Sequence, residues 1–144
     1  MAKISSAEWE VMRVLWTKGE TTSTEITKIL FTKQDWSAST VKTLLGRLAD
    51  KGYLTSRREG RTYLYQAVLN EEEANLRAVY EVLSKICLTK HSQLLGQLIQ
   101  QTPMMKEQIK DLQEILASKK SVERVQCDCQ PGQCHCVSHV EEDQ

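Results

Sequence analysis

Two helix-capping patterns near the start of the chain most constrain its fold, because they fix where short helices begin. Ser5-Ser6-Ala7-Glu8 and Thr22-Ser23-Thr24-Glu25 each place a hydroxyl three residues before a carboxylate. This arrangement satisfies the N–H groups that have no partner at a helix start. We expect Lys18-Gly19 to end the first helix, since glycine accepts the left-handed conformation that follows a helix.

A third helix is expected after a polar stretch at residues 32–35. It would open at Trp36-Ser37-Ala38-Ser39 and stop at Lys51-Gly52. Each of the three helices carries apolar residues at helical spacing, which gives it one buried face. These residues are Trp9, Met12, Leu15 and Trp16, then Ile26, Ile29 and Leu30, then Val41, Leu44, Leu45 and Leu48. We interpret the three tryptophans as core residues rather than as stacking platforms for bases.

A short hairpin is predicted directly after the third helix. Tyr53-Leu54-Thr55 and Thr62-Tyr63-Leu64-Tyr65 are rich in residues that favour strands. The segment between them, residues 56–61, contains three arginines and Gly60, which suits a tight turn. Three short helices followed by a hairpin with a basic tip predict a winged helix-turn-helix domain over residues 1–70, in a chain that is mainly α-helical.

The net charge of zero hides an uneven distribution of charge along the chain. Residues 1–70 carry 11 basic and 7 acidic side chains, a net charge of +4, which the second half balances. Residues 42–61 alone carry six basic and two acidic side chains, so the whole surplus lies in the third helix and the hairpin. A local positive surplus of this kind favours a polyanionic partner.

The exposed face of the third helix is the candidate surface for reading DNA bases. Short polar side chains let a helix enter the major groove, and lysine and arginine reach guanine edges there. The candidates on this face are Ser39, Thr40, Lys42, Thr43 and Arg47. The hairpin arginines Arg57, Arg58 and Arg61 are placed to bind phosphates. The alternative is that these residues form an ordinary solvated helix face and a charged turn.

The second half of the chain predicts three amphipathic helices over residues 71–120. The first would run from Asn70 to about Cys87, with Cys87 as a small buried residue on its apolar seam. Pro103 separates the second from the third, because proline breaks a helix interior. Short amphipathic helices need a partner surface, and a helix-turn-helix protein usually reads two half-sites as a symmetric pair. We therefore predict a homodimer.

Residues 121–144 have no helical periodicity and hold four of the five cysteines. Cys127, Cys129, Cys134 and Cys136 form two Cys-X-Cys arms, with Pro131-Gly132 between them to fold the arms together. Four thiolates favour zinc(II) or the softer copper(I). In an extended Cys-X-Cys arm the side chains point to opposite faces, which suits a bridged copper cluster better than one chelated ion.

The cellular location bears on how the cysteines are used. The sequence has no apolar run of about 18 residues and no apolar segment at its start, so we expect a cytoplasmic protein without a membrane partner. Cytosolic thiols stay reduced, which favours metal binding over disulfides. A purely structural zinc site stays open as an alternative. His135 and His139 lie close enough in sequence to be further ligands.

Three motifs follow one another in the third helix and the hairpin: Val41-Lys42-Thr43-Leu44-Leu45-Gly46-Arg47-Leu48, Lys51-Gly52-Tyr53-Leu54, and Glu59-Gly60-Arg61 with Tyr63. At these residues the sequence resembles the penicillinase-repressor family (BlaI/MecI) of winged-helix repressors. The cysteine motif of the tail is similar to that of the CopY branch, the copper-responsive repressors. Together the similarity covers about residues 4–136.

The resemblance implies a homodimer on an inverted-repeat operator with TACA/TGTA half-sites. It implies that the zinc(II) form represses and that copper(I), donated by a copper chaperone, displaces zinc at the four tail cysteines and releases the DNA. Repressors of the β-lactam branch are inactivated by cleavage at an Asn-Phe bond. The single phenylalanine here, Phe31, follows Leu30, so the metal tail is the expected input.

Two other functional classes remain open from sequence. A metal-buffering or metal-delivery protein would need the tail but has no use for the three hairpin arginines. A repressor with purely structural zinc would sense another signal. We do not expect an enzyme, because the three histidines have no obvious serine or carboxylate partner and four thiolates leave zinc no open position.

Overall fold

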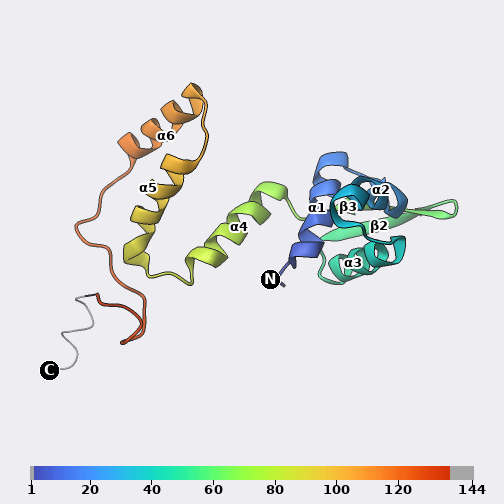
Figure 1. The fold of residues 1–144 in the computed structure, drawn as a ribbon, viewed down its shortest axis with the longest axis horizontal. Coiled ribbons are helices and arrows are strands. Elements are labelled where there is room, and N and C mark those ends of the chain that lie inside the picture. Colours follow the sequence, from blue (N-terminus) through green and yellow to red (C-terminus); the bar gives the residue numbers. More distant parts are fainter. Residues whose placement is uncertain (1, 137–144) are drawn as a thin grey trace. The chain divides into compact units, whose positions relative to one another are not determined.

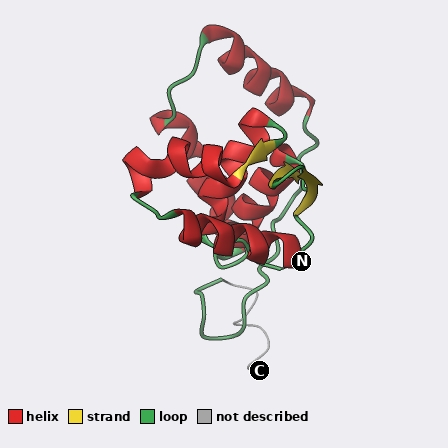
Figure 2. Cartoon of the chain, turned by 90° about the vertical axis from the view of Figure 1, so that its right-hand side faces the viewer, coloured by secondary structure: helices red, strands yellow, loops and turns green. Residues whose placement is uncertain are grey.

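The computed structural model describes residues 2–136, which divide into two compact units at the boundary between Arg77 and Ala78. Helices predominate, and one small antiparallel sheet accompanies them (Figure 2), which confirms the predicted fold class. The first unit holds α1 (Ser6–Lys18), β1 (Thr21–Thr22), α2 (Ser23–Gln34), α3 (Ala38–Asp50), β2 (Leu54–Glu59) and β3 (Thr62–Ala67). Next come α4 (Glu71–Leu83), which crosses the division, the 3₁₀ turn η1 (Leu88–Lys90), α5 (His91–Gln101) and α6 (Lys106–Ser118).

The helix starts of the first unit are capped as the sequence predicts. The hydroxyls of Ser5 and Thr22 accept hydrogen bonds from the backbone N–H groups of Glu8 and Glu25, at 3.1 and 3.2 Å. Gly19 follows α1 with a φ of +74°, a positive value that glycine adopts at little cost. Local hydrogen bonding therefore fixes these boundaries without help from distant residues.

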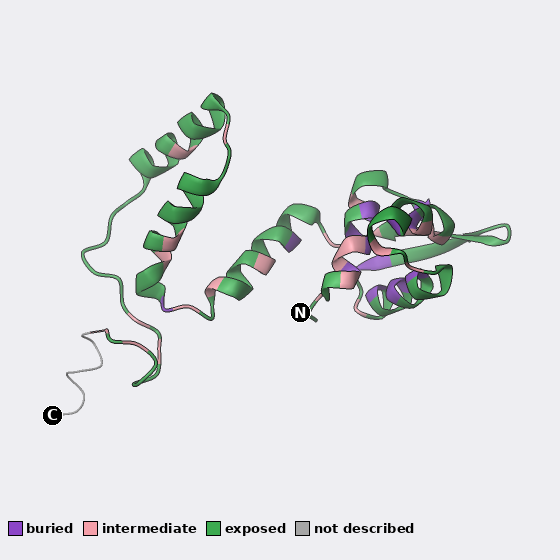
Figure 3. Cartoon of the chain, in the orientation of Figure 1, coloured by how far each residue is buried: buried purple, intermediate pink, exposed green. Residues whose placement is uncertain are grey.

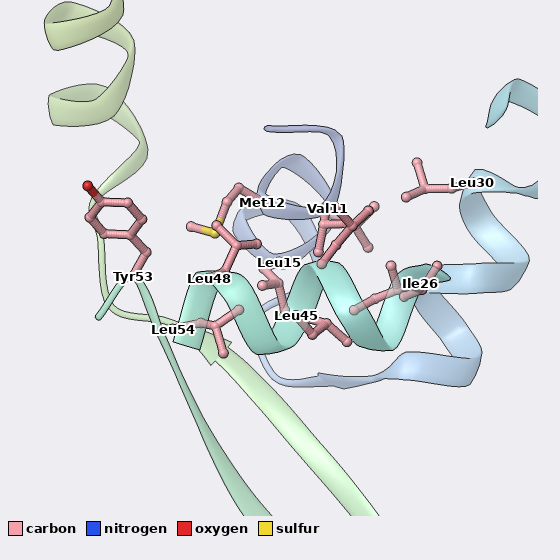
Figure 4. Packing of buried hydrophobic residues seen from close by; sticks show 12 residues of the cluster. Val11, Met12, Leu15, Ile26, Leu30, Leu45, Leu48, Tyr53 and Leu54 are labelled. Carbon is pink, nitrogen blue, oxygen red and sulfur yellow. The ribbon is translucent and has the colours of Figure 1, made fainter. Parts of the chain in front are cut away.

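The core of the first unit lies where α1, α2 and α3 meet (Figure 4). Figure 4 shows Leu45 and Leu48 of α3 facing α1. The cluster contains Val11, Met12, Val14, Leu15, Ile26, Leu30, Val41, Leu44, Leu45, Leu48, Tyr53 and Leu54. The predicted leucine stripe of α3 is confirmed in full, and α1 packs through a wider face than predicted because Val11 and Val14 are also buried.

Two details of the predicted helices are wrong. Ile29 is 37% exposed, because Ile26 and Leu30 point into the core and Ile29 lines a shallow pocket between α1 and α2. The polar stretch predicted to start at residue 32 is helical up to Gln34, and Asp35 ends α2 in the left-handed conformation. An aspartate in that conformation stops a helix as a glycine does.

The tryptophans are structural, as predicted, but they lie at the edge of the core. Trp16 and Trp36 are partly buried against the cluster, and the Trp16 indole donates a hydrogen bond to the carbonyl of Leu69 at 2.8 Å. Trp9 meets Trp16 edge to face, with ring centroids 5.4 Å apart. The indole of Trp16 thereby ties α1 to the segment that leads into α4.

The β2–β3 hairpin, called the wing below, extends past the helices (Figure 1). Its strands are longer and its turn is tighter than predicted, because pairing continues to Glu59 opposite Thr62. Gly60, with a φ of +63°, makes this turn possible. The sequence also missed the short strand β1, which pairs Thr21 with Tyr65 and makes the sheet three-stranded in the order β1-β3-β2.

The helices α4, α5 and α6 expose most of their apolar side chains (Figure 3). No residue of α5 or α6 is buried, although the structure describes both helices completely. The most exposed include Val79, Tyr80, Val82, Leu98, Ile115 and Leu116, at 53–63%. None of the described helices is both long and apolar enough to cross a membrane.

The first of these helices ends earlier than predicted. α4 stops at Leu83, and the N–H groups of Lys85 and Ile86 bond three residues back, in a tightening turn. The prediction that Cys87 lies on the seam of this helix is therefore wrong. Cys87 instead precedes η1 in a non-helical conformation, in a segment that we call the α4–α5 joint, residues 84–90.

Candidate nucleic-acid interface and metal centre

The outer face of α3 presents the residues predicted to read DNA. Ser39, Lys42, Thr43 and Arg47 are all exposed, opposite the buried leucine stripe. The Thr43 hydroxyl donates to the carbonyl of Ser39 at 3.0 Å, which holds the side chain against the helix and leaves its oxygen free to accept. The face is therefore open, polar and low in profile, as entry into a major groove requires.

Thr40 differs from its neighbours on α3 because it takes part in the helix cap. Its backbone N–H donates to the Ser37 hydroxyl at 3.2 Å, and the two hydroxyls lie 3.1 Å apart. The side chain is exposed, so contact with DNA stays a prediction for this residue as for the rest of the face.

The wing carries its cations in two different settings. Arg58 and Arg61 lie at the turn and are exposed, and the Arg58 Nε donates to the carbonyl of Gly60 at 3.0 Å. Arg57 instead pairs with Glu20, which precedes β1, and lies 3.6 Å from Glu59. Its hydrogen bond lowers the pKa of Glu20 and raises the pKa of Arg57. Sequence reasoning missed this pair because 37 residues separate its members.

Lys51 also belongs to the predicted basic surplus, but its role is structural. Its Nζ lies 2.6 and 2.9 Å from the carboxylate oxygens of Glu8 and 2.7 Å from the carbonyl of Lys3. Burial raises the pKa of Glu8, but hydrogen bonds from Lys51 and Ser5 outweigh it, so the net pKa lies below the ordinary value. Of the six cations between residues 42 and 61, Lys42, Arg47, Arg58 and Arg61 therefore remain available to a polyanion.

The two Cys-X-Cys arms fold back on each other, as the sequence predicts. The N–H of Gln133 donates to the carbonyl of Gln130 at 3.0 Å, and Gly132 adopts a φ of +93°. Proline followed by a left-handed glycine is typical of a type II turn. The turn brings the sulfurs of Cys127 and Cys134 to within 3.3 Å of each other.

The first arm is not extended, which corrects the expectation that its two thiols diverge. The N–H of Cys129 donates to the Cys127 sulfur at 3.3 Å, and this local bond bends the arm. The sulfurs of Cys127, Cys129 and Cys134 lie within 4.8 Å of one another and of a fourth sulfur. A set of this size fits one chelated ion, so the argument from spacing for a bridged cluster does not hold.

The fourth sulfur belongs to Cys87, which sequence analysis assigned to an apolar helix seam. Its sulfur lies 3.4 Å from that of Cys127 and 3.5 Å from that of Cys136, so it touches one thiol of each arm. The signal in the sequence was the odd number of cysteines, because the four-thiol motif leaves the fifth cysteine without an assigned role. We call the five residues the thiol cluster.

The predicted ligands thus converge, while the histidines do not join them. His135 is exposed and stands outside the four-thiol group found among the described residues. His139 lies beyond the residues that the structure describes. The proposed further ligand role of either histidine stays a prediction.

The pKa values of the cluster thiols are shifted in different directions. Hydrogen bonds from Thr89 lower the pKa of Cys87 to about 6. The Cys129 N–H lowers the pKa of Cys127, but burial and the neighbouring thiols outweigh it and the net shift is upward. The Cys129 thiol has a pKa raised to about 11, since burial and its neighbours outweigh its hydrogen bond to Cys127. Five thiolates this close repel one another, and a bound cation would relieve that repulsion.

The donor set fits a thiophilic metal ion. Tetrahedral zinc with Zn–S bonds of about 2.3 Å needs sulfurs roughly 3.8 Å apart. Within a group that spans 4.8 Å, the sulfurs of Cys127 and Cys134 lie 3.3 Å apart and those of Cys87 and Cys127 lie 3.4 Å apart, which approaches that arrangement. Copper(I) accepts the same soft donors. Cys87, Cys127, Cys129 and Cys134 are the residues that would hold one ion.

Relatives in sequence match this chain along most of its length, and a solved structure matches about half of it. An uncharacterized 16.5 kDa protein from the ptsI 3′ region of Latilactobacillus sakei is 40% identical over 136 residues, 93% of this chain and 93% of that protein. The penicillinase repressor of Bacillus licheniformis is 29% identical over 119 residues, 83% of this chain and 93% of that repressor. A solved CopR repressor structure is 42% identical, covers 48% of this chain and 100% of its own, and superposes with a TM-score of 0.41.

The family model described as penicillinase repressor matches residues 4–118. That match includes the winged-helix unit and all three later helices, and it ends before the cysteine arms. The members of this family regulate transcription and are not enzymes. This chain therefore belongs to the penicillinase repressor (BlaI/MecI/CopY) family of transcriptional repressors.

Proposed function

We propose that this repressor responds to copper and controls a copper-transport operon. In the proposal, a zinc(II)-loaded homodimer binds an inverted-repeat operator with TACA/TGTA half-sites in the cytoplasm. Copper(I) taken up by the thiol cluster, with a copper chaperone as donor, lowers the affinity for DNA. The observation that carries the proposal is the convergence of four cysteine sulfurs within 4.8 Å in a chain that begins with a winged helix.

The open cations of the first unit support the DNA part of the proposal. Lys42 and Arg47 lie on the exposed face of α3, where they would reach base edges, and Arg58 and Arg61 lie at the wing turn, where they would meet phosphates. A buffering protein would have no use for cations on two separate elements. Binding through phosphate contacts would weaken steeply as salt rises.

The exposed apolar faces of the second unit support the dimer. Leu98 and Leu116 are 56% and 63% exposed, on helices that bury none of their residues. Exposed apolar side chains in this number favour an interaction site. A second copy of the chain supplies a matching surface and the two-fold symmetry that an inverted repeat needs.

The metal part of the proposal relies on the chemistry of the thiol cluster. Zinc(II) with four thiolates and two copper(I) ions with four thiolates both carry a net charge of −2. Exchange of one for the other would therefore act through geometry and not through net charge. A usable switch needs a coupling between metal and operator of about 1–3 kcal/mol or more.

The experiment that tests the proposal follows both events in one sample. Copper(I) is titrated into the zinc-loaded protein on a labelled inverted-repeat duplex, with DNA followed by fluorescence anisotropy and zinc by a chromophoric chelator. We expect zinc release and DNA release to rise together. Loss of zinc with the DNA still bound would contradict the proposal and would leave metal buffering or a structural zinc site as the role of the cysteines.

A further inference from the structure

The thiol cluster holds the tail against the α4–α5 joint. Cys87 supplies the central sulfur, in contact with Cys127 at 3.4 Å and Cys136 at 3.5 Å. Two further contacts join the same segments. The N–H of Leu88 lies 3.4 Å from a carboxylate oxygen of Asp128, and the Thr89 hydroxyl lies 3.4 Å from the Cys136 sulfur.

The joint is itself held in place by His91, the first residue of α5. Its Nε2 lies 2.9 Å from the carbonyl oxygens of both Leu83, at the end of α4, and Ile86. Because both partners are acceptors, Nε2 must carry the proton. One imidazole thus bridges the end of α4, the joint and the start of α5, on either side of Cys87.

The surroundings of Cys87 argue against a role as a small core residue. It is 8% exposed, yet it lies outside the hydrophobic core cluster. Its close neighbours are two thiols and the hydroxyl of Thr89, at 3.0 Å. Among described residues 78–136 it is the single buried residue, and its close neighbours are other sulfur atoms rather than apolar side chains.

We propose that Cys87 is a ligand of the metal site and that the bound ion locks the tail onto the α4–α5 joint. This inference rests on the proposed function in that the tail must bind the ion. With zinc, the four-thiol set is Cys87, Cys127, Cys129 and Cys134. Cys136 stands beside this set and is the spare donor. Each ligand that is still a protonated thiol releases its proton to solvent when it binds.

The chemical consequence is that metal occupancy reaches the helices as well as the tail. A site built from the four tail cysteines alone could bind any ion while α4 and α5 stayed as they are. A site that includes Cys87 couples the ion to the end of α4 and the start of α5. Exchange of an ion that takes four thiolates for one that takes fewer would then alter the hold on the joint.

The direct test uses the full-length wild-type chain loaded with cadmium-113, a thiophilic stand-in for zinc. A proton–cadmium correlation spectrum identifies the cysteines whose β-protons couple to the ion. We expect coupling to Cys87, Cys127, Cys129 and Cys134. Coupling confined to the tail cysteines would overturn the inference. Since no residue is changed, this result does not depend on whether a variant folds.

Variants provide an independent measurement. Cys87→Ala keeps a small apolar side chain, so it preserves any packing role and removes only the ligand. We expect it to weaken zinc binding, measured by competition with a chelator, by about tenfold or more, and to reduce the sulfur-to-cobalt charge-transfer absorption of the cobalt(II) form. Ser84→Ala is the matched control, because it removes a hydroxyl of the same joint that donates to the Glu81 carbonyl, and it removes no thiol. Zinc affinity unchanged by Cys87→Ala would overturn the inference.

Cys136→Ser sharpens the assignment of the set. It leaves all four proposed ligands in place, so its zinc affinity should stay close to that of the wild-type chain, whereas Cys127→Ser should lose most of it. A larger loss for Cys136→Ser than for Cys87→Ala would overturn the inference. The proposed function fails separately, if copper(I) leaves the operator complex intact whichever cysteines bind the ion.

Discussion

Different interactions stabilise each of the two units of this repressor. The first has a core cluster of twelve buried apolar residues, which come from three helices and the start of the wing. The second, over described residues 78–136, buries one residue, and that residue is a cysteine. Hydrophobic burial stabilises a fold without further components. A thiol cluster does so only with an ion, and exposed helix faces do so only with a partner. The first unit therefore contains its own stabilising core, whereas the proposed function makes the second unit depend on a bound ion and on a second copy of the chain.

The largest expected effect comes from truncating a buried core side chain, which should destabilise the first unit and has no counterpart in the second. Leu45→Ala removes a fully buried side chain from the first unit and should lower its free energy of unfolding by about 2–5 kcal/mol. The matched substitution Leu98→Ala changes a residue that is 56% exposed. It should leave the unfolding of the first unit unchanged and weaken self-association. Thermal melts with analytical ultracentrifugation measure both, and equal destabilisation by the two variants would contradict the contrast.

Removal of metal should destabilise the second unit and leave the first unit unchanged. Free zinc at about 100 times its Kd stabilises the form that binds it by about 2.7 kcal/mol, which slows local opening about a hundredfold. Amide hydrogen exchange should therefore accelerate by about that factor in residues 84–90 and 127–136 when a chelator is added. Exchange in α1 and α3 should not change. Equal acceleration in both units would show that the first also depends on the ion.

Sequence predicted the first unit well because its determinants are local. The hydroxyls of Ser5 and Thr22 and the glycine at position 19 act within four residues, and the stripe from Val41 to Leu48 is one helical face. What sequence missed there involves residues far apart. Strand β1 exists only through β3, and the burial of Glu8 is tolerable only through Lys51, 43 residues away.

The candidate sites show the same contrast between features set by adjacent residues and features set by distant ones. The turn at Pro131-Gly132 brings the two cysteine arms together, and it can be read from adjacent residues. Cys87 lies 40 residues from Cys127, and α4 was expected to extend through it. The early end of α4 at Leu83 has no strong stop signal, since neither glycine nor proline follows it. A residue moved off a helix by a weak boundary cannot be assigned from periodicity.

The Glu8–Lys51 pair is a point at which the first unit departs from purely apolar packing. Glu8→Gln leaves the Lys51 ammonium without its carboxylate and should cost about 1–3 kcal/mol of stability. The folded-state pKa of Glu8 is below 4.5, so its contribution is fully present above about pH 4.5 and is lost as pH falls through the lower value. Urea unfolding from pH 3 to 7 measures this. A loss that is the same at all pH values would contradict the ionic origin.

On the proposed DNA-binding surface, some residues should determine the preference for the operator sequence and others should only add affinity for DNA. Arg47→Ala should weaken operator binding by about 1–3 kcal/mol and relax the preference for the operator over unrelated DNA. Arg58→Ala should weaken binding to both DNAs alike and reduce the slope of affinity against salt by about one. Anisotropy titrations at several salt concentrations distinguish the two. Equal loss of specificity from both variants would remove the assignment of α3 as the reading element.

The smallest expected effect concerns a cation that the fold already uses. Arg57 pairs with Glu20 and lies near Glu59, so Arg57→Ala should weaken DNA binding less than Arg58→Ala does. Glu20→Gln removes a negative charge and frees Arg57, and it should tighten binding to any DNA a few-fold while steepening the salt dependence. Stability should hardly change, because exposed ion pairs contribute little. If Glu20→Gln weakened binding, the carboxylate would instead be orienting Arg57 toward a phosphate, and the wing would contribute three cations.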